Sequence, residues 1–105
     1  MITFTDLLKR AESEHIAIHT PTAKQAKTLL KALDKRGYEW FLGDKLTTKT
    51  LYKEYKENTC YNFEPNNKIC YSPLRFYQNE GYAIIEFTEI DFAEIFDDKL
   101  YKGGK

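Results

Sequence analysis

The side chains best suited to bind a ligand gather in the middle of the chain. Between positions 52 and 62 the sequence reads Tyr-Lys-Glu-Tyr-Lys-Glu-Asn-Thr-Cys-Tyr-Asn. Tyrosine rings stack on bases, asparagine amides hydrogen-bond to base edges, and lysines meet phosphates. A histidine just before a predicted helix N-terminus, where anions are favoured, extends the set. We therefore expect a ligand-binding site formed by His19, Tyr55, Lys56, Asn58, Tyr61 and Asn62.

A purely structural role for the same residues is the alternative. Asn58 has the side chain to cap a turn, and Tyr61 has the bulk to pack on a helix. The structural interpretation is the favoured one for these residues, and ligand contact stays open because function tends to lie on exposed loop residues.

No combination of residues predicts catalysis. Nucleophilic chemistry needs a Ser or Cys beside a base that a carboxylate orients. The sequence has no nucleophile elbow, phosphate-binding loop or zinc-protease helix motif. His15 and His19 share one face of a predicted strand, but no Cys or carboxylate stands at metal-ligand spacing beside them. We therefore predict a protein that is not an enzyme, with no catalytic residues, metal or cofactor.

Composition limits the classes of partner. Lys plus Arg and Asp plus Glu each number 16, so the formal net charge is zero. This balance argues against a general electrostatic grip on nucleic acid, although a local basic patch stays open. No apolar run approaches the ~20 residues of a membrane span, and the N-terminus lacks a signal-peptide pattern. We expect a cytoplasmic protein, with one domain over residues 1–101 and a flexible tail over 102–105.

The stretch from Ile16 to Trp40 organises the predicted fold as strand, helix and strand. Thr22 with Gln25 forms a capping box at the helix start. Gly37 suits the left-handed conformation that ends a helix. Between these signals, four apolar residues recur at the spacing of one buried stripe, namely Ala26, Leu29, Leu30 and Leu33.

The other patterns predict smaller elements around this unit. A first helix starts after Thr3, and residues 45–58 predict a short helix or a long loop. The segments 59–63 and 68–72 predict a β-hairpin in which Cys60 lies opposite Tyr71, so that Cys60 and Cys70 face opposite sides as free thiols. The apolar run 82–87 predicts a central strand. The fold class expected is α+β: a single-layer, mainly antiparallel sheet of four to five strands packed against one main helix, with short accessory helices.

Three segments also resemble a known group of proteins. They read Leu-Asp-Lys-Arg-Gly-Tyr-Glu-Trp at 33–40, Tyr-Lys-Glu-Asn-Thr-Cys-Tyr-Asn at 55–62 and Glu-Gly-Tyr-Ala-Ile-Ile-Glu-Phe at 80–87. Over roughly residues 15 to 88 the chain resembles small uncharacterised proteins encoded by phages and prophages of Firmicutes. The resemblance implies a counter-defence role against bacterial immunity, exerted in the host cytoplasm, and carries no catalytic assignment.

Within that role, we expect sequestration of a nucleotide-derived immune signal, a molecular sponge. Because one small domain has limited pocket volume, we expect a homodimer or higher oligomer. The first alternative is a protein-level inhibitor, similar to an anti-CRISPR, that binds a host defence protein through a Tyr-rich face. The second is a small phage regulator that binds DNA through one helix face carrying Lys24, Lys27, Lys31 and Lys35, which otherwise forms the solvated side of the helix.

Overall fold

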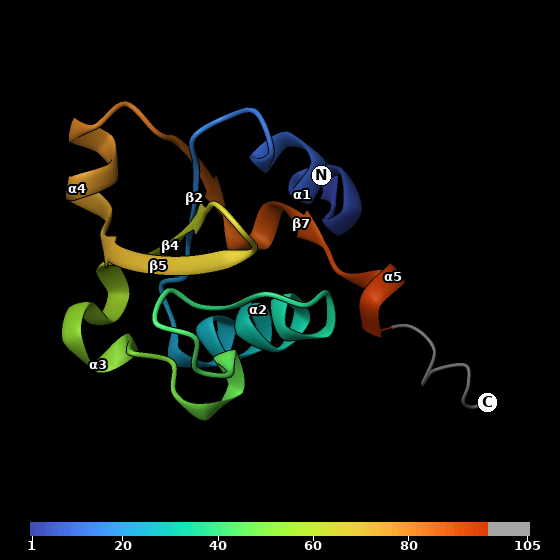
Figure 1. The fold of residues 1–105 in the computed structure, drawn as a ribbon. Coiled ribbons are helices and arrows are strands. Elements are labelled where there is room, and N and C mark those ends of the chain that lie inside the picture. Colours follow the sequence, from blue (N-terminus) through green and yellow to red (C-terminus); the bar gives the residue numbers. More distant parts are fainter. Residues whose placement is uncertain (97–105) are drawn as a thin grey trace.

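The computed structural model describes residues 1–96, and Figure 1 shows their arrangement. The predicted domain boundary at residue 101 and the predicted tail at 102–105 lie outside these residues. The helices are α1 (Phe4–Ala11), α2 (Ala23–Lys35), α3 (Tyr52–Tyr55), α4 (Leu74–Asn79) and α5 (Ala93–Phe96), with 3-10 turns η1 (Leu46–Thr48), η2 (Lys56–Asn58) and η3 (Phe87–Glu89). The strands are β1 (Ile2–Thr3), β2 (Ile16–His19), β3 (Glu39–Trp40), β4 (Thr59–Glu64), β5 (Lys68–Pro73), β6 (Ala83–Glu86) and β7 (Ile90–Asp91).

Five strands form the main sheet in the order β3-β5-β4-β2-β6. The β4 strand is antiparallel to both β2 and β5, whereas the outer pairs β3–β5 and β2–β6 are parallel. The predicted α+β class and the number of strands are confirmed, and the sheet is mixed. A second, two-stranded parallel sheet joins β1 to β7.

The α2 helix follows the sequence signals closely. The Thr22 hydroxyl accepts a hydrogen bond from the Gln25 backbone N–H at 3.1 Å, which confirms the predicted cap. The return half of the capping box is not formed, since the buried Oε1 atom of Gln25 has no hydrogen-bond partner within residues 1–96. Gly37 follows the helix with a φ of +89°, which a residue with a Cβ adopts at a cost. The predicted apolar stripe is fully buried.

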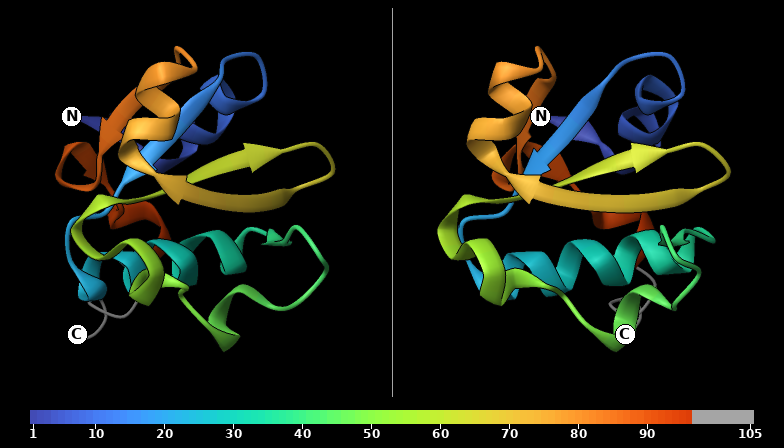
Figure 2. Two further views of the ribbon diagram at one scale, coloured as in Figure 1. Left: turned by 90° about the vertical axis from the view of Figure 1, so that its left-hand side faces the viewer. Right: turned by 60° about the vertical axis from the view of Figure 1, so that its left-hand side comes forward.

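Helices cover both faces of the main sheet, as Figure 2 shows with α2 below the β4–β5 hairpin and α4 above it. On the α2 face, the side chains of Ile18, Tyr61 and Ile69 join the larger core. On the α4 face, Tyr77 packs on a smaller cluster that includes Ala17 and Cys60. Large residues thus fill one side of the sheet, and small residues on the other make room for the rings of α4.

The β6 strand lies at the edge of the sheet, so the prediction of a central strand is wrong. Both of its faces are nevertheless covered. Ala83 and Ile85 pack on the larger core, and Ile84 packs on the smaller cluster. Coverage on two faces therefore accounts for the apolar run, which the sequence pattern alone attributes to a central position.

The hairpin register differs from the predicted one by one residue. Cys60 lies opposite Ser72 and Asn62 opposite Cys70, so both thiols share the α4 face instead of facing opposite sides. The ladder extends to a pair between Glu64 and Lys68. The three-residue turn that this pairing leaves is feasible because Asn66 and Asn67 both adopt positive φ, which asparagine tolerates better than most residues. Both cysteines are free, as predicted.

Candidate functional site

His19, one of the six predicted ligand-binding residues, ties the sheet to the η2 turn. Its Nδ1 atom lies 2.8 Å from a carboxylate oxygen of Glu86, and its Nε2 atom lies 2.8 Å from the carbonyl oxygen of Glu57. Both partners are hydrogen-bond acceptors, and the two contacts occupy both ring nitrogens. His19 is thereby engaged on both sides by the protein itself.

Tyr61 and Asn62 are buried on opposite faces of β4. Tyr61 is 1 % exposed on the α2 face, where its hydroxyl donates to the Thr50 carbonyl oxygen at 2.6 Å. Asn62 is 3 % exposed on the α4 face, where it accepts from the Tyr77 hydroxyl and donates to Glu64. The two side chains therefore hold the fold together and do not line a common site.

The other three predicted residues lie on the surface near the start of β4. The Tyr55 ring lies 5.8 Å from the ring of Tyr71, and Lys56 and Asn58 are exposed in η2. The structure thus brings His19 close to the turn that carries Lys56 and Asn58. It places Tyr55 at the other side, beside β5, so the six residues do not converge on one cavity.

Glu86, His19 and Cys60 stand side by side on β6, β2 and β4, in the order of a carboxylate, an imidazole and a thiol. This order is that of a nucleophilic triad, but the geometry is not. Burial of the thiol raises the pKa of Cys60 to about 12, and neither ring nitrogen of His19 is left to act as its base. The thiol stays protonated at neutral pH, so these three side chains do not provide an activated nucleophile. Their role is to hold neighbouring strands together.

A small hollow with aromatic walls lies at the opposite edge of the sheet, where the chain turns after β3. We call it the aromatic hollow. Its volume is about 150 Å³, and it is lined by Trp40, Phe41, Leu42, Asp44, Lys49, Leu51 and Tyr71. Phe41 is 43 % exposed and Leu42 is 81 % exposed, although both are large apolar residues. We call the exposed apolar surface of Phe41 and Leu42 the lip of the hollow. Flat rings and this apolar lip make the hollow suited to an aromatic ring of a ligand.

Trp40, which lines the aromatic hollow, carries an unused hydrogen-bond donor. The side chain is 1 % exposed and packs against the rings of Tyr61 and Tyr71, at centroid distances of 6.0 and 5.9 Å. Its indole N–H is buried and has no acceptor among residues 1–96. A buried donor without a partner is costly, and most buried polar groups in proteins are satisfied. An acceptor on a bound ligand would remove that cost.

A second hollow, of about 330 Å³, adjoins the first and shares Lys49 and Leu51 with it. We call it the lysine hollow; its other lining residues are Thr50, Tyr52, Lys53 and Glu54. The Lys49 ammonium lies 3.1 Å from the Asp44 carboxylate. Lys53 is exposed and has no ion-pair partner in the part of the chain that the structure describes. The two hollows are thus lined by two ammonium groups, of Lys49 and Lys53, and by two carboxylates, of Asp44 and Glu54.

The segment that borders both hollows is fixed by hydrogen bonds from tyrosines. Tyr61 holds the Thr50 carbonyl oxygen, Tyr52 donates to the Pro21 carbonyl oxygen, and Tyr71 donates to the Glu54 carboxylate at 2.8 Å. Leu51 between them has a φ of +60°, an unfavourable value for a branched aliphatic residue. Such local strain persists where the surroundings hold it, and it is frequent at ligand sites.

The sequence contains one signal for the aromatic hollow. Trp40, Phe41 and Leu42 are consecutive large apolar residues just before a Gly-Asp turn. Strand alternation places at most every second one of them in the core, so one exposed apolar residue was to be expected. The unpaired indole N–H has no signal in the sequence, because it depends on the packing of three segments.

Residues 1–96 contain no group of three His, Cys, Asp or Glu side chains arranged to hold a metal ion. Over the same range, no helix has both the length and the apolar character needed to cross a membrane. Comparisons of the chain with protein-family models, with curated proteins and with solved structures found no match.

Proposed function

We propose that this protein is a non-enzymatic binding protein for a nucleotide-like ligand, held across the aromatic hollow and the lysine hollow. The observation that carries the proposal is Trp40, which lines a hollow walled by rings and whose buried indole N–H has no acceptor among residues 1–96. A nucleobase has flat faces for Phe41 and Tyr71 and acceptor atoms for the indole. Its phosphate then reaches the ammonium groups of Lys49 and Lys53 in the adjoining hollow.

The role that we propose for this binding is sequestration of a nucleotide-derived immune signal by a phage-encoded protein. The resemblance of three segments to small phage and prophage proteins supports this setting. The small volume of the aromatic hollow, about 150 Å³, supports a homodimer or higher oligomer, because a drug-sized ligand occupies roughly 300 Å³ or more. A second copy over the exposed lip would enclose such a ligand.

The single tryptophan makes the proposal testable by direct observation. The chain has one Trp, so its fluorescence and its indole N–H cross-peak in a nitrogen-15 NMR spectrum report on the surroundings of Trp40 alone. We would titrate the protein with a panel of mononucleotides and cyclic dinucleotides. We expect at least one of them to quench the fluorescence and to move the indole resonance in the direction of hydrogen bonding.

Two exposed phenylalanines provide a matched pair of variants. Phe41 is 43 % exposed at the hollow, and Phe76 is 45 % exposed on α4. Phe41→Ala should weaken binding about tenfold, from the loss of ~1–3 kcal/mol of stacking, whereas Phe76→Ala should leave the affinity unchanged. The proposal is wrong if no member of the panel moves the indole resonance, or if both variants bind equally well.

The exposed lip favours a second candidate, direct binding of a host defence protein. Phe41 and Leu42 project apolar surface that a protein partner would bury. In that case nucleotides leave the indole resonance unchanged, and Leu42→Asp abolishes co-purification of a host protein from infected cells. Retained co-purification with Leu42→Asp would contradict this candidate.

A further inference from the structure

The outer face of α2 carries a continuous row of positive charge. Figure 2 shows the helix on the outside of the molecule, and the η1 turn packs beside it. The exposed side chains of this face, which we call the lysine row, are Lys24, Lys27, Lys31 and Lys35. At a rise of 1.5 Å per residue, the row spans about 16 Å. In the described part of the chain, none of its members has an ion-pair partner within 4.0 Å.

The stability of α2 does not explain the lysine row. From Lys27 to Lys35 its members stand four residues apart, a spacing at which like charges on a helix repel. Lys24 lies in the first turn, where the helix dipole disfavours a cation and where no acidic residue is present. The one acidic residue of the helix, Asp34, is paired with Lys45 at 3.0 Å. A partner that brings negative charge would therefore relieve repulsion that the helix itself does not offset.

An apolar pocket opens beside the middle of the lysine row. It lies between α2 and the segment that carries η1, its volume is about 120 Å³, and we call it the leucine pocket. Its lining residues are Lys27, Leu30, Lys31, Leu46, Thr47 and Thr50. Leu30 and Leu46 are almost fully buried and form its inner end, and the aliphatic stems of the two lysines flank it. Since an apolar cavity of roughly 150 Å³ holds benzene, this pocket is suited to one branched aliphatic side chain.

The make-up of the pocket favours a peptide over a nucleic acid. Proteins that bind single strands without sequence preference stack the bases on aromatic rings, and no ring lines the leucine pocket. The pocket stands between two ammonium groups, and the row continues beyond it in both directions. Its ligand should therefore carry negative charges on both sides of an apolar group. An extended peptide of about five residues, at about 3.3 Å per residue, spans the row.

We propose that α2 binds an acidic segment of a partner protein, in which carboxylates flank one leucine or a similar aliphatic residue. The aliphatic side chain enters the leucine pocket, and the carboxylates on either side of it pair with the lysine row. This surface does not depend on the nucleotide binding proposed at the aromatic hollow. Its pocket shares one lining residue, Thr50, with the lysine hollow.

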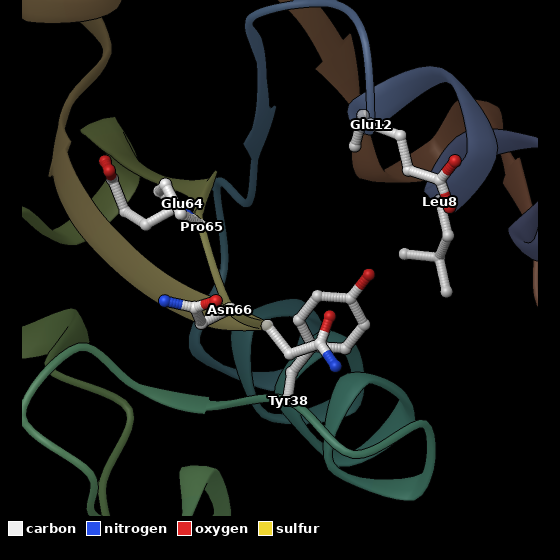
Figure 3. Close-up of a pocket in the computed structure, with 8 residues that line it drawn as sticks. Leu8, Glu12, Tyr38, Glu64, Pro65 and Asn66 are labelled. Carbon is white, nitrogen blue, oxygen red and sulfur yellow. The ribbon is translucent and has the colours of Figure 1, made fainter.

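A larger cavity elsewhere in the molecule provides an internal control. It lies between α1 and the β4–β5 turn and has a volume of about 380 Å³ (Figure 3). Glu12 and Glu64 border it, and their side chains point away from each other in this view. Carboxylates repel an acidic ligand, so we expect no binding there. The resonances of Tyr38 and Asn66, which also line this cavity, therefore report effects that are not specific to α2.

Matched peptides separate the contribution of charge from that of the apolar side chain. The probe is the peptide Asp-Glu-Leu-Glu-Asp with both ends blocked. We expect it to shift the NMR resonances of Leu46 and Thr47 and to leave those of Tyr38 and Asn66 unchanged. Serine in place of the leucine should weaken binding about tenfold, through the loss of apolar burial. The uncharged peptide Asn-Gln-Leu-Gln-Asn should not bind.

A charge reversal in the row should change affinity and stability in opposite directions. Lys31→Glu should weaken binding of the acidic peptide about tenfold, because it replaces an attraction by a repulsion. The same substitution places a carboxylate one turn from Lys27 and from Lys35, so the melting temperature should rise. The matched control is Lys9→Glu, at an exposed site on α1 without an ion pair among residues 1–96, and it should bind normally.

Several outcomes would overturn the proposal. It is wrong if the acidic peptide does not bind, if the uncharged peptide binds as well, or if Lys31→Glu binds the acidic peptide as the parent does. Pentathymidylate that binds more tightly than the acidic peptide would assign the lysine row to nucleic acid instead. Self-association of the parent protein that Lys31→Glu abolishes would assign the row to a second copy of this chain.

Discussion

At the scale of single residues, the Tyr61 hydroxyl connects β4 to the segment that borders the aromatic hollow. It donates to the Thr50 carbonyl oxygen at 2.6 Å from a ring that is almost fully buried. The same strand carries Asn62, which the Tyr77 hydroxyl holds from the opposite face. Two buried tyrosine hydroxyls therefore stabilise two different sides of one strand.

This arrangement predicts a difference between two conservative variants. Tyr61→Phe and Tyr77→Phe should each lower the free energy of unfolding by about 1–2 kcal/mol, because each leaves a buried acceptor without its donor. Tyr61→Phe alone should also speed hydrogen exchange around Thr50. Urea unfolding measures the first effect, and exchange followed by NMR measures the second. Equal protection of this segment in both variants would contradict the role given to Tyr61.

His19 supports a second prediction at this scale. His19→Leu removes the hydrogen bonds to Glu86 and to the Glu57 carbonyl oxygen, which join β6, β2 and η2. We expect faster hydrogen exchange through residues 56–59 and a lower melting temperature. His15→Leu is the control, since His15 lies at the surface and its ring contacts Tyr82. An unchanged exchange rate in His19→Leu would show that η2 is held by other contacts.

The types of these residues are evident from the sequence, but their use is not. Tyr61 and Asn62 are consecutive in a strand, so strand alternation already forbids both from facing one ligand. Which of the two side chains forms hydrogen bonds within the fold depends on Thr50 and Tyr77, which are distant in sequence. Whether the indole N–H of Trp40 has an acceptor likewise depends on how three segments pack together. Residue chemistry thus predicted a ring-binding and phosphate-binding site at His19 and residues 55–62, without identifying which of these side chains the fold itself uses.

At the scale of elements, we expect substitutions at two neighbouring sites at the start of α2 to change the stability of the protein differently. Thr22→Ala removes the cap to the Gln25 N–H and should cost about 1 kcal/mol. Gln25→Met replaces a buried, unpaired amide oxygen by an apolar group of similar size, so stability should stay the same or rise. Thermal unfolding of both variants distinguishes these effects. A large loss in Gln25→Met would show that the amide is satisfied by solvent.

Local signals determined the elements that the sequence predicted well. The α2 helix carries its own cap, stripe and terminating glycine, and the structure matches them. The hairpin register and the place of β6 depend on distant pairings. The pair of Glu64 with Lys68, and the turn with positive φ at Asn66 and Asn67, shift the register by one residue. The edge position of β6 reflects the absence of a second strand partner for it in residues 1–96, where it pairs with β2 alone.

At the scale of the whole molecule, a buried thiol and several tyrosine hydroxyls predict that the folded state loses stability at alkaline pH. Burial raises the pKa of Cys60 to about 12, and burial together with Glu54 raises that of Tyr71 to about 12. Burial also raises the pKa values of Tyr61 and Tyr77. The folded protein therefore keeps protons that the unfolded chain releases from about pH 9 upward.

The sign of the pH effect follows from that difference. Where the unfolded chain binds fewer protons than the folded protein, stability falls as pH rises. We expect a constant free energy of unfolding from pH 7 to about 8.5, and then a decline of about 1.4 kcal/mol per pH unit for each such group. Urea unfolding across this range measures it. A free energy of unfolding that holds steady or rises above pH 10 would contradict the burial of these groups.

The position of β2 inside the sheet affects the order in which a newly made chain can fold. β2 leaves the ribosome early, yet its parallel partner β6 comes much later, with His19 and Glu86 separated by 67 residues. The β4–β5 hairpin closes through a short turn and is the local pairing that forms fastest. Until residues 83–86 emerge, β2 has one flank without a strand partner, and such an open edge is a template for pairing with other chains. Synthesis from residue 19 to residue 86 is therefore the interval in which a nascent chain exposes this open edge of β2.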